Sequence, residues 1–238
     1  MSEQANNIPE PNKPPRYEPA FNVPGVVLLL GAIMIAIQAG TPFLATDAYY
    51  LGLEVFAFIP ASWSFPLGQL YLPASRFWSP VTYAFLHADW THVLANLVWF
   101  ASFGSAVARR LGNGRFLVFL VLATIASAAA HGLLNMESNL PMIGASGAVS
   151  GCMGAAVRFA FTPNARGNDV QRPALSLVQS LQNRGVLAFV VLWFVFNWLF
   201  GSGIVPLAGV ENQIAWEAHA GGFIFGLLAF RLFDPVQT

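Results

Sequence analysis

A serine, two histidines and an asparagine stand in otherwise apolar segments of this sequence, and together they could cleave an amide bond. Ser146 lies in the stretch PMIGASGAVSGCMGAAVRFAF, residues 141–161. A serine hydroxyl is a weak nucleophile until a base takes its proton, and His219 is the candidate base. Asn96 and His92 are four residues apart, so they share one helix face and could donate hydrogen bonds to an oxyanion together with the Ser146 N–H. These residues predict nucleophilic catalysis by a Ser–His dyad.

The composition predicts that the elements carrying these residues are membrane helices. The chain of 238 residues is 56% hydrophobic and only 9% charged, with a mean hydropathy of +0.58, whereas soluble domains carry about 25% charged residues. Apolar runs near the length needed to cross a bilayer occur at residues 26–44, 90–108, 116–134, 146–162, 186–203 and 214–233. We therefore expect an all-α membrane protein, a bundle of six transmembrane helices. The fourth run is the shortest.

Spacing to arginines places the candidate residues at one depth. Ser146 lies twelve residues before Arg158, His219 twelve before Arg231, and Asn96 thirteen before Arg109. Twelve helical residues span about 18 Å, so arginines at the inner boundary would put these groups roughly 10 Å below the outer surface of a core of about 30 Å. A fourth helix that begins at Ser146 leaves the segment 135–145 at membrane depth, where irregular backbone is tolerated beside a hydrated cavity. The sequence therefore predicts a recessed pocket above Ser146.

Positive charge predicts the orientation of the helices. Ten of the eleven Lys and Arg residues fall on one side of the six-helix arrangement, and only Arg76 falls on the other, so both termini are expected in the cytoplasm. Residues 1–22 are polar and Pro-rich and are expected to form a disordered cytoplasmic tail before one membrane domain, residues 23–238. Neither a cleaved signal nor a transit peptide is apparent, which favours a bacterial inner membrane. The aromatic-rich connection of about 45 residues before residue 90 is either a membrane-associated loop or simply a hydrophobic linker.

Other polar residues in the apolar runs have plainer interpretations. His131 is expected near the outer interface, and Asn197 is expected to bond to a neighbouring helix. Glu217 is two residues from His219 and so on a different helix face, either facing the interior or hydrated near the surface. Cys152 is expected to be a small packing residue. The lack of CxxC and HExxH patterns predicts no metal site. The zero net charge gives no indication of a nucleic-acid partner, and nothing indicates an oligomeric state.

Small residues predict close contact between the helices that carry Ser146 and His219. Gly147, Gly151 and Gly154 lie near one face of the first, and Gly222 and Gly226 form a GxxxG pattern on the second. Such spacing lets helix backbones approach closely in a membrane.

Three motifs together resemble the rhomboid family of intramembrane serine proteases: HADWTHVLANL at residues 87–97, GASG at 144–147 and AHAGGFIFG at 218–226. The resemblance implies a six-helix rhomboid-type bundle with a long first loop, Ser146 as nucleophile and His219 as general base. It also implies that Asn96 and His92 stabilise the oxyanion, that Gly144 keeps the oxyanion hole open, and that His87 supports the site by hydrogen bonding. Substrates would be single-pass transmembrane proteins in the lipid bilayer, cut near the outer end of the spanning segment, without metal or cofactor.

Two positions depart from the family pattern. Ser150 stands where many relatives have an aromatic residue packed on the catalytic histidine. The pocket is therefore either looser here, or another aromatic residue such as Phe223 or Trp216 fills the space. Relatives often have Trp-Arg in the first loop, whereas here Ser79 follows Trp78. A proteolytically inactive rhomboid-like protein that binds transmembrane clients is the main alternative. A transporter or channel is a third possibility, but it predicts polar groups at several depths, whereas here they converge on one.

Overall fold

The protein is described by a computed structural model covering residues 22–64, 72–161, 173–202 and 215–236. These residues are predominantly helical, and their only β-type pairing is an isolated bridge between Phe58 and Met142. The prediction of an all-α chain is therefore confirmed for the described residues. The predicted tail, residues 1–22, lies outside them except for its last residue.

The predicted apolar runs correspond to the major helices. These are α1 (Gly25–Gly40), α4 (Trp90–Trp99), α5 (Ser105–Leu111), α6 (Asn113–Leu134), α7 (Ser146–Ala156), α9 (Arg184–Gly201) and α10 (Trp216–Phe233). A π-helical segment, η5 (Phe100–Gly104), joins α4 to α5 without a break. Shorter elements are η1 (Thr41–Phe43), α2 (Thr46–Phe56), η2 (Pro60–Trp63), α3 (Ser75–Thr82), η4 (Tyr83–Phe85) and α8 (Leu177–Gln182).

Four helices in the described part of the chain are long and apolar enough to cross a membrane. They cover Gly25–Phe43, Trp90–Leu111, Asn113–Leu134 and Arg184–Gly201. The helix α7 has only 11 residues and begins at Ser146, as the sequence predicts. The chain is therefore an integral membrane protein by the length and composition of its helices.

The connection between α1 and α4 contains the helices α2 and α3. Trp78 and Arg76 both make hydrogen bonds within this connection. The indole N–H of Trp78 donates to the Val55 carbonyl at 2.9 Å, and the guanidinium of Arg76 donates to the Ser62 carbonyl. Both side chains thus bond α3 to the earlier part of the connection, at Val55 and Ser62. Whether this region lies in the outer leaflet stays a prediction.

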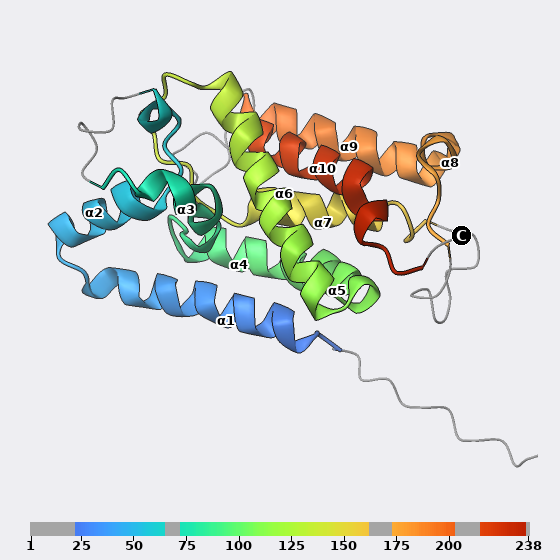
Figure 1. Cartoon of the computed structure of the whole chain (residues 1–238), viewed down its shortest axis with the longest axis horizontal. Helices are drawn as coiled ribbons and strands as arrows, with labels where there is room; N and C mark the ends of the chain where they lie inside the picture. The colour runs from blue at the N-terminus through green and yellow to red at the C-terminus, as the bar shows by residue number, and fades with distance from the viewer. Residues whose placement is uncertain (1–21, 65–71, 162–172, 203–214, 237–238) are drawn as a thin grey trace, which may run out of the picture.

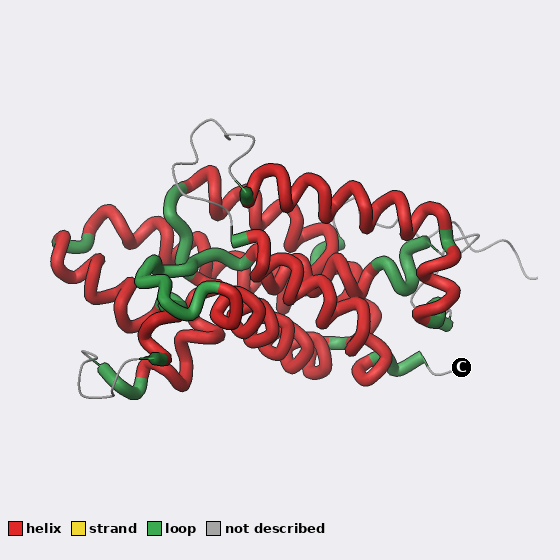
Figure 2. The backbone as a smooth tube through the Cα atoms, turned by 90° about the horizontal axis from the view of Figure 1, so that it is seen from above, coloured by secondary structure: helices red, strands yellow, loops and turns green. Residues whose placement is uncertain are grey.

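The helices α6, α7 and α10 pack closely, and α7 lies at the centre of the molecule (Figure 1). Figure 2 shows helices forming the body, with loop segments at its two ends. A Cβ placed on Gly222 would overlap the carbonyl oxygen of Gly147, and one on Gly226 would overlap that of Gly151. Larger residues there would push α7 and α10 apart, so the predicted glycine contact between these helices is confirmed.

Buried arginines hold the end of the bundle opposite to Ser146. Arg110 is fully buried and forms two hydrogen bonds with the Asp234 carboxylate, at 3.0 and 2.8 Å. Arg158 is also buried and donates to the carbonyls of Leu175 and Leu227, at 2.8 and 2.6 Å. It was expected at the inner boundary, yet it points into protein, because these two carbonyls accept its hydrogen bonds.

Candidate active site

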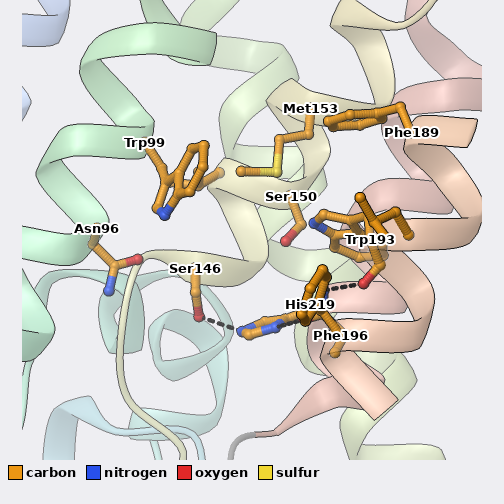
Figure 3. Close-up of a pocket in the computed structure, with 12 residues that line it drawn as sticks. Asn96, Trp99, Ser146, Ser150, Met153, Phe189, Trp193, Phe196 and His219 are labelled. Carbon is orange, nitrogen blue, oxygen red and sulfur yellow. Dashed lines mark hydrogen bonds between the residues drawn. The ribbon is translucent and has the colours of Figure 1, made fainter. Parts of the chain in front are cut away.

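Ser146 and His219 meet at the contact between α7 and α10 (Figure 3). The Oγ of Ser146 lies 2.7 Å from Nε2 of His219, a hydrogen-bond distance. Ser146 is the first residue of α7, where backbone N–H groups have no partner within the helix. The close packing of Gly147 against Gly222 brings the two side chains together. The structure thus places these two predicted residues in the arrangement that proton transfer requires.

Asn197 extends this pair to a third helix. Its Oδ1 lies 2.5 Å from Nδ1 of His219, while its Nδ2 donates to the Trp193 carbonyl of its own helix at 2.7 Å. The prediction that Asn197 bonds to a neighbouring helix is confirmed, but the sequence did not identify His219 as its partner. A signal was present, because Asn197 follows Arg184 by thirteen residues, the same spacing as between Asn96 and Arg109.

The backbone before Ser146 has a conformation that requires glycine. Gly144 has φ = 112°, a region that side-chain-bearing residues rarely adopt. Its N–H donates to the Tyr83 carbonyl at 3.0 Å, and Met142 pairs with Phe58 through two backbone hydrogen bonds. A Cβ at position 144 would lie 2.7 Å from Nε2 of His92. Gly144 therefore lets the chain approach His92 just ahead of Ser146.

The predicted oxyanion residues lie on α4. Asp89 caps this helix by accepting from the His92 backbone N–H at 2.7 Å. Nδ1 of His92 faces the Ala88 N–H at 3.5 Å, so its Nε2 carries the hydrogen and points toward Gly144. The Asn96 amide donates one N–H to the His92 carbonyl at 2.9 Å, and its oxygen is on the side of Ser146 in Figure 3. The second N–H of Asn96 becomes available to the pocket only if the amide turns.

His87 contacts the backbone beside Ser146. It is buried in the loop before α4, its Nε2 faces the Ala145 N–H at 3.4 Å, and its ring packs edge-on against His92 with centroids 5.0 Å apart. Burial, with a smaller contribution from the charge of His92, lowers the pKa of His87 to about 4. His87 is therefore neutral at physiological pH.

A cavity of about 440 Å³ opens beside the Ser146–His219 pair. It is lined by Asn96 and Trp99 of α4, by Ser146, Val149, Ser150 and Met153 of α7, by Phe189, Leu192, Trp193, Phe196 and Asn197 of α9, and by His219. The sequence left open whether the pocket is looser at Ser150 or whether Phe223 or Trp216 fills the space, and neither of these two aromatic residues is among those that line the cavity. Phe223 is fully buried against Trp193, with centroids 4.5 Å apart, and Trp216 packs at Gly201. The aromatic side chains that line the cavity are Trp99 of α4 and Phe189, Trp193 and Phe196 of α9.

The remaining polar residues lie apart from the Ser146–His219 pair. Glu217 lies 3.6 Å from His131, so these two form their own partly buried pair between α10 and α6. Glu217 does not complete a triad with His219. Cys152 is fully buried, as expected of a packing residue.

Comparison with known proteins identifies the family. The sequence profile of the Rhomboid domain matches residues 74–234, more than half of the chain. Proteins named rhomboid protease GlpG from Salmonella choleraesuis, Salmonella paratyphi A and Salmonella newport are each 30% identical over 150 residues. The matched region is 63% of this chain and 46% of each relative, so the chain spans about half the length of these relatives.

Proposed function

We infer that this chain, which belongs to the rhomboid family, is an intramembrane serine endopeptidase that uses Ser146 and His219. The observation that carries the proposal is the 2.7 Å contact between Ser146 Oγ and His219 Nε2. A serine held against an imidazole at the N-terminus of a helix is suited to attack a peptide carbonyl. The match to proteins named rhomboid protease supports the same reaction class.

The reaction would proceed in two steps. Ser146 Oγ bonds to the carbonyl carbon of the scissile peptide while its proton passes to His219 Nε2. When the tetrahedral intermediate collapses, the C–N bond breaks, and the leaving amine takes that proton. The carbonyl carbon then remains bonded to Ser146 as an ester. Water then attacks this ester while His219 Nε2 takes one of its protons. When the C–Oγ bond breaks, His219 returns that proton to Ser146 Oγ, and the second peptide product leaves as a carboxylic acid.

The negative oxygen of each intermediate would be stabilised by donors from two helices. The Ser146 N–H belongs to the first turn of α7, where it has no partner within the helix. The Nε2–H of His92 points toward Gly144, one residue from the loop's junction with α7. Asn96 would turn its free N–H toward the oxyanion when substrate displaces the oxygen that now faces the pocket. Such preorganised donors are typically worth about 10² to 10³ in rate.

The substrate would be a single-pass transmembrane protein lying in the bilayer. The cavity is lined by α4 on one side and α9 on the other, and its aromatic and apolar walls suit a transmembrane segment. In this proposal six helices cross the membrane, both termini are cytoplasmic, and the chain resides in a bacterial inner membrane. The site then lies near the outer surface, at the depth predicted from the arginine spacing.

A fluorophosphonate probe tests the proposal without knowledge of a substrate. Purified full-length protein in detergent is labelled alongside the variants Ser146→Ala and His219→Ala. We expect labelling of the wild type, none of the Ser146 variant, and at least about 100-fold slower labelling of the His219 variant. Ser105→Ala is the matched control, because Ser105 is also buried in a membrane helix but lies away from this site.

Two outcomes would contradict the proposal. Equal labelling of all variants would show that the probe reacts elsewhere, so that Ser146 is not an activated nucleophile. A folded wild type that is not labelled would favour the alternative of an inactive protein that binds transmembrane clients.

A further inference from the structure

We propose that Asn197 is the positioning residue that fixes the tautomer and orientation of His219. This inference rests on the proposed function. It extends the Ser–His dyad to three hydrogen-bonded residues, Ser146 of α7, His219 of α10 and Asn197 of α9. Its basis is a continuous series of three contacts, from Trp193 to Asn197, from Asn197 to His219, and from His219 to Ser146.

The carbonyl of Trp193 determines which end of the Asn197 amide faces His219. A backbone carbonyl only accepts hydrogen bonds, so the amide atom 2.7 Å from it must be the donor Nδ2. With the amide reversed, two oxygens would face each other at that distance without a hydrogen. The oxygen Oδ1 is therefore the atom that lies 2.5 Å from His219 Nδ1.

An acceptor on Nδ1 determines the protonation of the imidazole. A neutral imidazole carries one hydrogen, and opposite an amide oxygen that hydrogen must be on Nδ1. The lone pair is then on Nε2, 2.7 Å from Ser146 Oγ. This is the tautomer that accepts the serine proton. During the reaction the proton moves from Oγ to Nε2, and Nδ1 keeps its hydrogen bond to Asn197.

The same contact restrains the ring. His219 is only half-buried, and rotation about its χ angles could turn Nε2 away from Ser146. Asn197 is itself restrained by its bond to Trp193, which stacks on the fully buried Phe223 with ring centroids 4.5 Å apart. The packing of Trp193 against Phe223 thus holds the Asn197 amide in place, and this amide in turn holds the His219 ring in its orientation.

Two substitutions separate a positioning role from a structural one. Asn197→Leu keeps the number and branching of the side-chain heavy atoms but removes the acceptor, and Asn197→Asp keeps an acceptor while introducing a carboxylate. If Asn197 only packed between membrane helices, leucine would be the better-tolerated replacement, since charge is costly there. If it positions His219, aspartate is the better one. Which of the two variants labels faster therefore distinguishes a positioning role of Asn197 from a purely structural one.

The measurement is the rate of fluorophosphonate labelling of Ser146 as a function of pH, with thermal stability recorded for each variant. We expect Asn197→Leu to label about 10- to 100-fold more slowly than wild type at every pH. Asn197→Asp should label within about threefold of wild type, with the acid limb of its profile moved to higher pH because a carboxylate favours the imidazolium. Asn135→Leu is the matched control: Asn135 likewise donates to a carbonyl four residues back, at 3.0 Å, but its histidine neighbour is His131.

A second measurement on the wild type does not depend on the folding of variants. The ¹⁵N spectrum of labelled histidine, assigned by comparison with His219→Ala, should show hydrogen on Nδ1 and none on Nε2 at neutral pH. Labelling of Asn197→Leu at the wild-type rate, or a spectrum with hydrogen on Nε2, would overturn the inference while leaving the Ser–His proposal intact. Failure of the wild type itself to label would instead remove the proposed function.

Discussion

Replacement of Gly222 by alanine tests whether the contact between α7 and α10 positions the reactive pair. A Cβ at Gly222 would overlap the backbone carbonyl oxygen of Gly147 and would lie 2.6 Å from Ser127 Oγ. The serine hydroxyl can rotate away, but a backbone carbonyl moves only with its helix. Carbon needs about 3.5 Å from its neighbours, so α7 and α10 must separate by roughly 1 Å or more at this level.

That separation acts directly on the reacting atoms. Gly147 is adjacent to Ser146, and Gly222 is one helical turn from His219, so the 2.7 Å contact between Oγ and Nε2 would lengthen beyond hydrogen-bond distance. A misplacement of about 1 Å can reduce the rate roughly 100-fold. Overpacking costs about 1–3 kcal/mol, and alanine in place of helical glycine recovers about 0.5–1 kcal/mol. The variant should therefore remain folded and lose activity.

The assay compares labelling rate and thermal unfolding for Gly222→Ala and Gly114→Ala. Gly114 lies in the first turn of α6, where an added Cβ meets no atom within 4 Å, so this variant should label at the wild-type rate. Ser127→Ala combined with Gly222→Ala should not restore labelling, because the Gly147 carbonyl remains. If Gly222→Ala labels within threefold of wild type, the helices can separate without loss of the site, and the reasoning is refuted.

Two further predictions concern stability. Asp234→Ala should lower the free energy of unfolding by about 3–5 kcal/mol, measured by denaturant titration, because it removes the carboxylate that forms two hydrogen bonds with the fully buried Arg110. The double replacement Arg110→Met with Asp234→Leu should recover most of that loss. His87 has a pKa of about 4 in the folded protein, so between pH 4 and 6.5 it binds fewer protons there than in the unfolded chain, and stability falls as the pH drops through this window. From pH 7.5 to 4.5 this histidine contributes a loss of about 2–3 kcal/mol in the free energy of unfolding. The variant His87→Gln should not show this loss, and an equal loss in that variant would contradict the argument.

Much of the fold could be predicted because lipid imposes a strong pattern on the sequence. Apolar runs gave the positions of the major helices to within a few residues, and the short run beginning at Ser146 correctly indicated where α7 starts. The glycine pattern indicated which helices touch. The helices α2 and α3, in contrast, lie in a connection where neither length nor periodicity marked them, and their hydrogen bonds to distant carbonyls depend on the folded chain.

The sequence predicted that Ser146 and His219 would pair, but it did not predict the other hydrogen bonds of the candidate site. Ser146, His219 and Asn96 line one cavity, as their common depth implies. Depth, however, says nothing about the rotation of a helix about its own axis. Packing determines that rotation, and it turned Asn197 of α9 toward His219, while it turned Glu217 toward His131. Ser150 also lines the cavity, and the rotation of α9 about its axis places Trp193 and Phe196 there as well.

In the proposed protease, an asparagine at position 197 suits a Ser–His pair that lies at membrane depth. An aspartate would hold the same tautomer, but its charge would have to be desolvated whenever the base is neutral, which is costly in a membrane. An amide oxygen accepts from Nδ1 without that cost, and it stabilises the imidazolium less. The base would then return its proton to the leaving amine more readily. In the proposed protease, a neutral acceptor on α9 therefore orients the histidine without placing a second charge beside it.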